Sequence, residues 1–193
     1  SSAGMTAAFG ALKALVPVIT ISSLLALTKK AIDAGDALHD LSIKTGASVE
    51  FLSSLSLHAE QSGTSIEALA QGLKFMNRNL AEAGSNKAAA EAFTQIGLSV
   101  EKLKSLNTEG QFMAIAQNIS ELGTESERTK ALMDVFGRSG ADLAVFMEQG
   151  AEGLKKAREE AEKLGLVMTK EEADKMDAFN DKWSEMAKTL QYG

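Results

Sequence analysis

Few residues in this 193-residue chain are of the types that perform chemistry. The two histidines each have a carboxylate nearby, since Asp40 follows His39 and Glu60 lies two residues after His58. A carboxylate can orient an imidazole ring or favour its protonated form, as metal sites and general-base catalysis require. The two histidines fall on different expected helices, however, and no further ligand pattern such as His-Glu-x-x-His accompanies them. We therefore expect solvated or helix-end histidines.

Clusters of serine, glycine and acidic residues also lack the partners that catalysis needs. Ser53, Ser54 and Ser56 have no His–Asp arrangement and no Gly-x-Ser-x-Gly motif with them, which indicates an exposed helix face. The segment Gly137–Gly140 has no strand before it and no Gly-Lys-Ser/Thr after it, so we expect a turn between helices. Paired carboxylates such as Glu159–Glu160 have Lys three or four residues away, which supports a helix. We predict a protein that is not an enzyme and has no cofactor.

Composition excludes further classes of site. The chain has no Cys, which excludes disulfides, thiolate zinc sites and a cysteine nucleophile. It carries 26 acidic and 20 basic side chains, for a net charge of −6. Proteins bind the phosphate backbone through Lys and Arg that displace counterions, so we expect no specific nucleic-acid binding. An acidic protein that shares a narrow space with DNA would repel it and leave it mobile.

Apolar residues repeat at helical intervals along the chain. Two such stripes are Ile66, Leu69, Leu73, Met76, Leu80, Ala83 and Phe112, Ile115, Ala116, Ile119, Leu122. No run shows the alternating, β-branched and aromatic pattern of a strand. The sequence therefore predicts an all-α fold.

Start and stop signals divide this pattern into short helices punctuated by glycine. Ser48, Ser65 and Ser99 are predicted N-caps, and Thr124–Glu127 and Thr169–Glu172 are predicted capping boxes. Glycines that accommodate the left-handed conformation are common just past helix ends. The predicted stops are Gly46, Gly63, Gly84, Gly97, Gly123, Gly137, Gly150 and Gly165.

Three segments are expected: a hydrophobic helix over residues 1–28, a multi-helix region over residues 29–166 and a charged amphipathic helix over residues 167–193. The first segment has Lys13 as its only charge. Its uncharged run Ala14–Thr28 is shorter than the roughly 18 apolar residues typical of a spanning helix, unless the count extends through Lys13. A buried or oligomer-packed helix and membrane contact both stay open. The candidate residues for either contact are Leu15, Val16, Val18, Ile19, Ile21, Leu24, Leu25 and Leu27.

The last segment has a longer helix with an apolar seam of heptad spacing. Its residues are Met176, Phe179, Trp183, Met186 and Leu190, at intervals of 3, 4, 3 and 4. We expect this seam to mediate self-association into a homo-oligomer. Because the chain starts without Met and stops inside a periodic pattern, we also expect it to be a piece of a longer polypeptide.

Two blocks of sequence carry a resemblance to a known family. The first runs from Ala37 to Glu50, ALHDLSIKTGASVE, and continues to Ala83. The second runs from Ala131 to Leu143, ALMDVFGRSGADL, and is followed by Glu159–Leu166. In this order and spacing they resemble the tape measure proteins of long-tailed phages and prophages. There the patterns Asp-x-Leu-x-(aliphatic)-x-Thr-Gly-x-Ser-(aliphatic)-Glu-x-Leu and Phe-Gly-(Lys/Arg)-Ser-Gly-Ala-Asp-Leu recur, and the similarity covers about residues 30–190.

The resemblance implies a structural virion protein in the lumen of the phage tail, assembled in the bacterial cytoplasm. Its roles would be tail assembly, length determination and genome ejection, without catalytic residues in this region. The implied partners are other copies of itself, tail tube and tail tip or baseplate proteins, tail assembly chaperones, and the host membrane on ejection. Short helices punctuated by glycine differ from one long ruler helix, so we expect a compact or end region of such a protein.

Two other functions stay open. A membrane-active, helical pore-forming or toxin-like protein would shield the segment Ala14–Leu27 among amphipathic helices and release it at a bilayer. A helical adaptor would use its apolar stripes to bind partner helices.

Overall fold

The computed structural model describes the backbone of residues 21–192 and the side chains of residues 33–182. Within residues 21–192 it contains ten helices and no strand, which confirms the all-α prediction. The helices are α2 (Ile21–Thr45), α3 (Val49–Gln61), α4 (Ile66–Glu82), α5 (Lys87–Thr94), α6 (Val100–Lys104), α7 (Thr108–Ser120), α8 (Glu125–Phe136), α9 (Ser139–Asp142), α10 (Gly150–Lys163) and α11 (Lys170–Tyr192).

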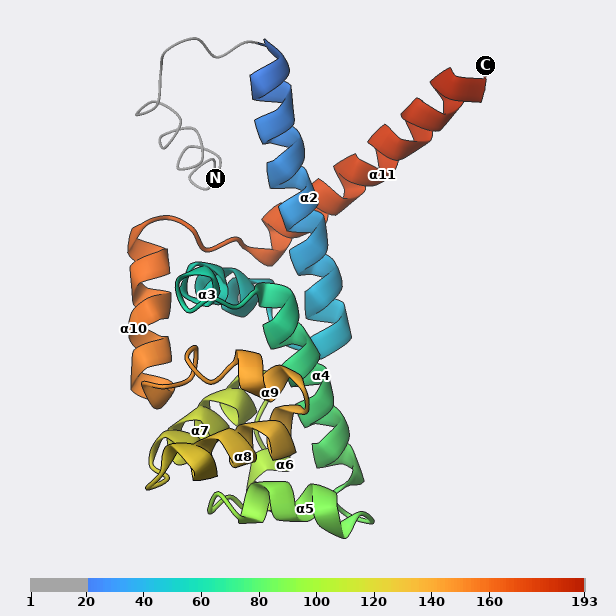
Figure 1. Ribbon diagram of the computed structural model, residues 1–193. Helices are drawn as coiled ribbons and strands as arrows, with labels where there is room; N and C mark the ends of the chain where they lie inside the picture. Colours follow the sequence, from blue (N-terminus) through green and yellow to red (C-terminus); the bar gives the residue numbers. More distant parts are fainter. Residues whose placement is uncertain (1–20, 193) are drawn as a thin grey trace.

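Helices α3 to α10 form a body from which α2 and α11 extend as two arms (Figure 1). Helix α4 packs against α8 and α9, and α10 packs along both α3 and α7. Helices α2 and α11 cross at one end of the body and then diverge, while α5 and α6 lie toward the opposite end (Figure 1). The body is therefore one packed helical unit, and the two arms extend from the same end of it.

The predicted helix starts are confirmed. Ser48, Ser65 and Ser99 each accept a hydrogen bond from the backbone N–H three residues later. Thr124 and Glu127 form a reciprocal capping box at α8. Thr169 and Glu172 exchange the same pair of bonds at the start of α11. These caps satisfy backbone donors that an α-helix leaves unpaired in its first turn.

Two glycines let α9 fold back against α4 and α8. Gly137 ends α8 with a φ of 65°, and a Cβ built there would lie 2.7 Å from Cδ2 of Phe75. A Cβ on Gly140 would lie only 2.3 Å from the carbonyl oxygen of Leu132, so two backbones are in direct contact. The predicted turn between helices covers Gly137 and Arg138 only, because Ser139 and Gly140 already belong to α9. Of the eight predicted stop glycines, Gly84 and Gly123 do not have a positive φ, and Gly150 begins α10 instead of ending a helix.

The two predicted apolar stripes face one core. In α4 the side chains of Leu69, Leu73, Met76 and Leu80 are buried, with Ile66 and Ala83 partly buried at the ends. In α7 the side chains of Phe112, Ile115, Ala116 and Ile119 are buried. Full burial of one large apolar side chain contributes about 1.5–3 kcal/mol. These stripes therefore provide much of the free energy that holds α4 and α7 inside the body.

The prediction that Ser53, Ser54 and Ser56 form an exposed helix face is wrong for Ser53 and Ser54, and Ser56 is only partly exposed. Ser53 and Ser54 are buried. The hydroxyl of Ser53 accepts a hydrogen bond from the backbone N–H of Met168 at 2.9 Å. The hydroxyl of Ser54 accepts one from Nε of Arg158 at 3.0 Å. Helix α10 and the segment after it cover this face of α3, a long-range contact that serine spacing does not reveal.

The hydrophobic segment predicted over residues 1–28 lies mostly outside the described residues, including Leu15, Val16, Val18 and Ile19. Ile21, Leu24, Leu25 and Leu27 belong to the backbone of α2, but their side chains are outside the described part. Helix α2 continues without a break past residue 28. Among the helices of the described region, none is long and apolar enough to cross a membrane.

The contact at Gly140 predicts that the stability of the fold depends strongly on that residue. Gly140→Ala should lower the free energy of unfolding by about 3 kcal/mol, because overpacking of this kind forces backbone movement. Gly84→Ala is the matched control, since no atom lies within 4 Å of a Cβ built there. Urea unfolding followed by circular dichroism measures both variants. Equal midpoints for the two variants would contradict the direct contact between the backbones of α8 and α9.

Candidate interaction site at the crossing of α2 and α11

Helix α11 lies directly across α2, and a glycine makes the close approach possible. A Cβ built on Gly35 would lie 2.3 Å from Sδ and 2.9 Å from Cβ of Met176. Ala173, one turn earlier on α11, is completely buried. With only a hydrogen atom at Gly35, the thioether of Met176 occupies the space that any larger side chain would need.

Hydrogen bonds between described side chains join the arms across the crossing. Nδ1 of His39 lies 2.9 Å from Oδ1 of Asp174. Nδ2 of Asn180 donates to Oδ2 of Asp36, also at 2.9 Å. The expectation of a solvated or helix-end residue is wrong for His39, which lies inside α2 and is partly buried against α11. Its ring connects two segments that are 135 residues apart.

Each of the two crossing helices carries a row of aspartates. They are Asp33, Asp36 and Asp40 on α2, and Asp174, Asp177 and Asp181 on α11. Each trio is spaced by three and then four residues, which places its members on one face of a helix. Of these residues, Asp36 and Asp174 form hydrogen bonds to the opposite helix, with Asn180 and His39 respectively.

The carboxyl groups respond differently to their neighbours. A hydrogen bond with Asp36, together with loss of hydration, raises the pKa of Asp177 above its ordinary value, and the charge of Asp181 adds to this effect. The hydrogen bond from the Lys170 ammonium lowers the pKa of Asp174, and His39 contributes in the same direction. The pKa of one carboxyl at the crossing is thus raised, while that of another is lowered.

The predicted self-association seam begins inside this site. Met176 packs against Gly35 of the same chain, and Phe179 is half exposed. Trp183, Met186 and Leu190 belong to the helical backbone of α11, but their side chains lie outside the described residues. The seam therefore stays a prediction, and its first member already has a contact within the chain.

Sequence reasoning missed the residues of α2 that receive α11. Gly35, Asp36 and His39 were not identified as parts of a contact, and neither was their approach to Asp174 and Asn180. One signal was available, because both arms carry aspartates with the same spacing of three and four residues. Two acidic stripes predict exposed faces, however, and only the folded chain shows that the two helices meet.

The second histidine also has a structural position. His58 lies in the last turn of α3, as the helix-end expectation requires, and its Nε2 is 2.9 Å from the carbonyl oxygen of Phe146. The imidazole and the ring of Phe146 are stacked at a tilt with centroids 4.8 Å apart. His58 therefore holds the segment after α9 against α3 through these two contacts. Among the described side chains, no group of three or more His, Asp or Glu is placed to hold a metal ion.

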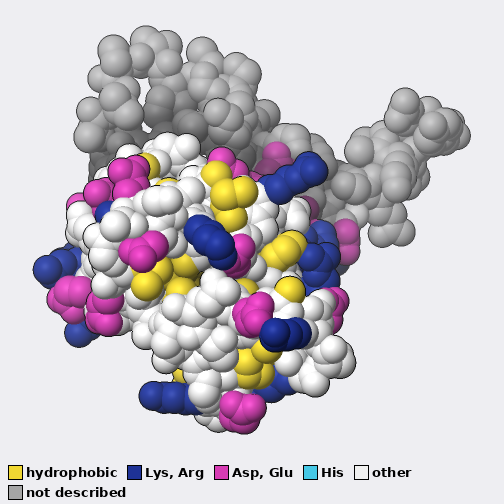
Figure 2. All heavy atoms as spheres, turned by 60° about the horizontal axis from the view of Figure 1, so that its bottom comes forward, with side chains coloured by type: hydrophobic (Ala, Val, Ile, Leu, Met, Phe, Trp, Pro, Cys, Tyr) yellow, Lys and Arg dark blue, Asp and Glu magenta, His cyan; other side chains and the backbone are white. Residues whose placement is uncertain are grey.

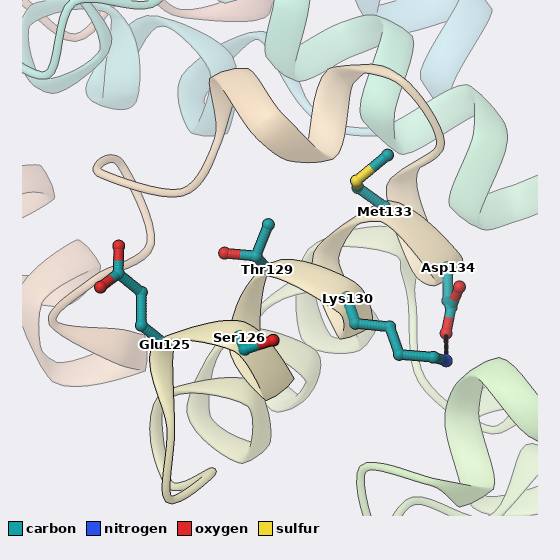
Figure 3. Close-up of a pocket in the computed structure, with 6 residues that line it drawn as sticks. All are labelled: Glu125, Ser126, Thr129, Lys130, Met133 and Asp134. Atoms are coloured by element: carbon teal, nitrogen blue, oxygen red, sulfur yellow. Dashed lines mark hydrogen bonds and ion pairs between the residues drawn. The ribbon is translucent and has the colours of Figure 1, made fainter.

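A shallow hollow on the outer face of α8 is a second place where polar side chains gather (Figure 3). Its lining consists of Glu125, Ser126, Thr129, Lys130, Met133 and Asp134. All six come from one helix, and the Lys130 ammonium forms an ion pair with the Asp134 carboxylate at 2.5 Å. Because the basic group is already paired and the lining comes from α8 alone, these side chains do not converge on a ligand.

The fold and the crossing define a helical protein with a packed body and two arms. Comparisons of the chain with models of protein families, with curated proteins and with solved structures found no match.

The crossing predicts an energetic coupling between Gly35 and Met176. Gly35→Ala should lower the protection of α11 amides against hydrogen exchange by about tenfold or more, because the added methyl displaces Met176. Amides of α4 serve as the internal reference and should keep their protection. Adding Met176→Ala removes the clash and should restore part of the loss. Unchanged protection of α11 in the single variant would show that the helices do not approach as closely as described.

Proposed function

We propose that this chain is a structural, non-enzymatic protein of a phage tail, of the tape measure type. It acts in the lumen of the tail tube during tail assembly, length determination and genome ejection. The single observation that supports the proposal most strongly is that the two blocks that resemble the family pack against each other in one core. The blocks are separated by about 50 residues of sequence, so their contact is a property of the fold.

The contacts between the blocks are specific. Nδ2 of Asn79, from the first block, donates to the backbone carbonyl of Asp134 in the second block at 2.9 Å. A Cβ built on Gly72 of α4 would lie 2.9 Å from Cδ1 of Leu143 and 3.5 Å from Cδ1 of Phe136, both in the second block. Asn79 is itself buried. The residues that carry the resemblance are therefore the residues that hold α4, α8 and α9 together.

The Thr-Gly-x-Ser motif of the first block also has a structural role. The hydroxyl of Thr45 donates to the carbonyl of Leu41 at 2.7 Å and accepts from the N–H of Ala47 at 3.2 Å. Gly46 follows with a φ of 72°, and Ser48 caps α3. The motif forms the corner between α2 and α3.

The distribution of charge supports passage of DNA without specific binding. At the end of the body shown in Figure 2, Lys and Arg lie among Asp and Glu, with small groups of apolar side chains between them. Several lysines are paired within their own helix, such as Lys44 with Asp40 and Lys87 with Glu91. Binding of the phosphate backbone needs clustered, unpaired basic groups.

The body is compact, which favours an end of the tape measure over its extended ruler part. A ruler helix extends about 1.5 Å per residue, whereas helices α3 to α10 fold back on one another. We therefore assign this region to an end of the tape measure, near the tail tip or baseplate. Other copies, tube proteins and assembly chaperones are the partners during assembly, and the host membrane is the partner on ejection.

Electron microscopy of tails tests this function. Deleting residues 29–166 in frame removes about 140 residues, roughly 200 Å of a continuous helix. We expect tails of unchanged length that fail to infect. Shortening by roughly 200 Å would instead assign this region to the ruler. Normal tails with full infectivity would contradict a role in the tail.

A point variant of unchanged chain length distinguishes the effect of the fold from the effect of chain length. Gly140→Ala keeps the chain length but disrupts the body, so tail length should stay normal while infectivity falls. Gly84→Ala is the control and should retain both properties. A change in tail length with Gly140→Ala would indicate that the body itself contributes to measuring.

A further inference from the structure

A hollow on the surface of the body is built from three helices. It has a volume of about 300 Å³, and its lining comes from α4, α6 and α7. The lining residues are Asn77, Leu80, Ala81, Lys104, Thr108 and Gln111, so it contains a lysine and no carboxylate, although the chain is acidic overall. The hollow on α8 differs in both respects, because its lining comes from one helix and its lysine is paired with an aspartate.

Two carboxamide groups in this lining have their orientation fixed by backbone carbonyls. Nδ2 of Asn77 donates to the carbonyl oxygen of Thr45 at 2.7 Å. Nε2 of Gln111 donates to the carbonyl oxygens of Leu103 at 3.1 Å and Leu106 at 2.9 Å. A carbonyl oxygen can only accept a hydrogen bond, so the nitrogen of each carboxamide must face these carbonyls. Its oxygen is left without a partner in the described part of the chain.

The side-chain oxygen of Gln111 is accessible from the hollow. Gln111 is only 8% exposed. Among the described side chains, the fully enclosed polar atom without a hydrogen bond is Oγ1 of Thr64. Oε1 of Gln111 is therefore not fully enclosed, and the hollow that Gln111 lines is its opening to solvent. A buried side chain with a free acceptor is thus available to a donor that enters the hollow.

The lining also provides donors that no described residue uses. The ammonium of Lys104 forms no ion pair with a described side chain, and the hydroxyl of Thr108 forms no hydrogen bond with one. Lys74 is a second lysine without an ion pair in the described region. It lies on the same face of α4 as Asn77 and Ala81, because the three positions are spaced by three and then four residues. The hollow therefore offers two donors and two acceptors under a positive local charge.

We propose that this hollow binds an acidic residue of a partner polypeptide. The carboxylate of an Asp or Glu pairs with the ammonium of Lys104 and accepts a hydrogen bond from the hydroxyl of Thr108. A backbone N–H of the same segment donates to the side-chain oxygen of Gln111 or Asn77. A neighbouring apolar side chain of the segment packs on Leu80. This inference does not depend on the function proposed above, since it requires only the hollow and its unused polar groups.

The acceptors in the lining favour a peptide over the phosphodiester backbone of a nucleic acid. Phosphodiester oxygens accept hydrogen bonds and donate none, so they would leave both carboxamide oxygens without a partner. A buried acceptor that loses water without gaining a donor costs free energy. An acidic peptide segment supplies a carboxylate for the lysine and N–H groups for the carboxamides, which matches both kinds of group.

The loop between α6 and α7 is ordered before a partner binds. Asn107 caps α7, with its Oδ1 accepting from the N–H of Gly110 at 2.9 Å. A Cβ built on Gly110 would lie 3.0 Å from Oδ1 of Asn107 and 3.3 Å from Cβ of Leu106, so the loop packs tightly against the helix. Leu106 is 38% exposed and adds apolar surface to this loop. A site that is already ordered loses less conformational entropy on binding.

An NMR titration of the whole chain tests the proposal. The probe is the peptide acetyl-Ala-Glu-Leu-Ala-amide, and the control is the same peptide with Gln in place of Glu. We expect saturable shifts of the side-chain amide signals of Asn77 and Gln111 and of the backbone signals of Lys104 and Thr108, with a dissociation constant on the order of 1 mM. The Gln peptide should bind about tenfold more weakly, because its contact with the lysine is not assisted by charge. The absence of saturable shifts, or equal affinity for the two peptides, would overturn the proposal.

A matched pair of charge variants tests whether the hollow itself is responsible. Lys104→Gln should weaken binding of the Glu peptide by about tenfold, whereas Lys104→Arg should retain most of the affinity. Lys155→Gln removes the same charge from an exposed position on α10 and should leave the affinity unchanged. An equal loss in Lys104→Gln and Lys155→Gln would indicate attraction by net charge alone and would contradict a site. Unchanged signals of α4 residues distant from the hollow verify that each variant is folded.

Inorganic phosphate distinguishes an acidic residue from a phosphate group as the ligand. At the concentration that saturates the site with the Glu peptide, phosphate should neither produce the same shifts nor displace the peptide. Phosphate that reproduces the shifts of Asn77 and Gln111 would overturn the assignment of this hollow to an acidic polypeptide.

Discussion

The packing of Phe112 against three other phenylalanines is the interaction on which the rest of the body depends. Its ring centroid lies 5.9 Å from that of Phe51, 5.8 Å from that of Phe136 and 6.4 Å from that of Phe146. The first two pairs have the edge-to-face geometry that contributes about 0.5–1.5 kcal/mol beyond buried area. The four rings come from α7, α3, α8 and the segment after α9. These parts of the chain must therefore be in place together, which makes the body cooperative.

The body and the arms are held by different physical forces. Inside the body, apolar stripes and glycines permit close packing, of side chains against Gly72 and of one backbone against another at Gly140. At the crossing, hydrogen bonds between polar side chains accompany a small apolar contact at Met176. Apolar packing is insensitive to pH, whereas carboxyl pairs are not. The body and the arms therefore depend on different kinds of contact.

Local signals in the sequence predicted most of the helices, because N-caps and apolar spacing act over a few residues. Ser48, Ser65, Ser99 and Thr124 cap helices as predicted. Predictions about exposure failed where distant segments meet. Ser53 and Ser54 are covered by residues more than 100 positions away, and His39 meets Asp174 across a similar separation. Local spacing shows which residues share a helix face, but not which element covers that face.

The central claim is that this chain is part of a phage tail, and its location in purified particles tests that claim most directly. Intact tails are treated with protease, and the surviving peptides are identified by mass spectrometry before and after the tube is opened. If the chain lies in the tail lumen, its peptides should be present in purified tails. They should resist the protease until the tube is opened. Absence of its peptides from purified tails would contradict the account.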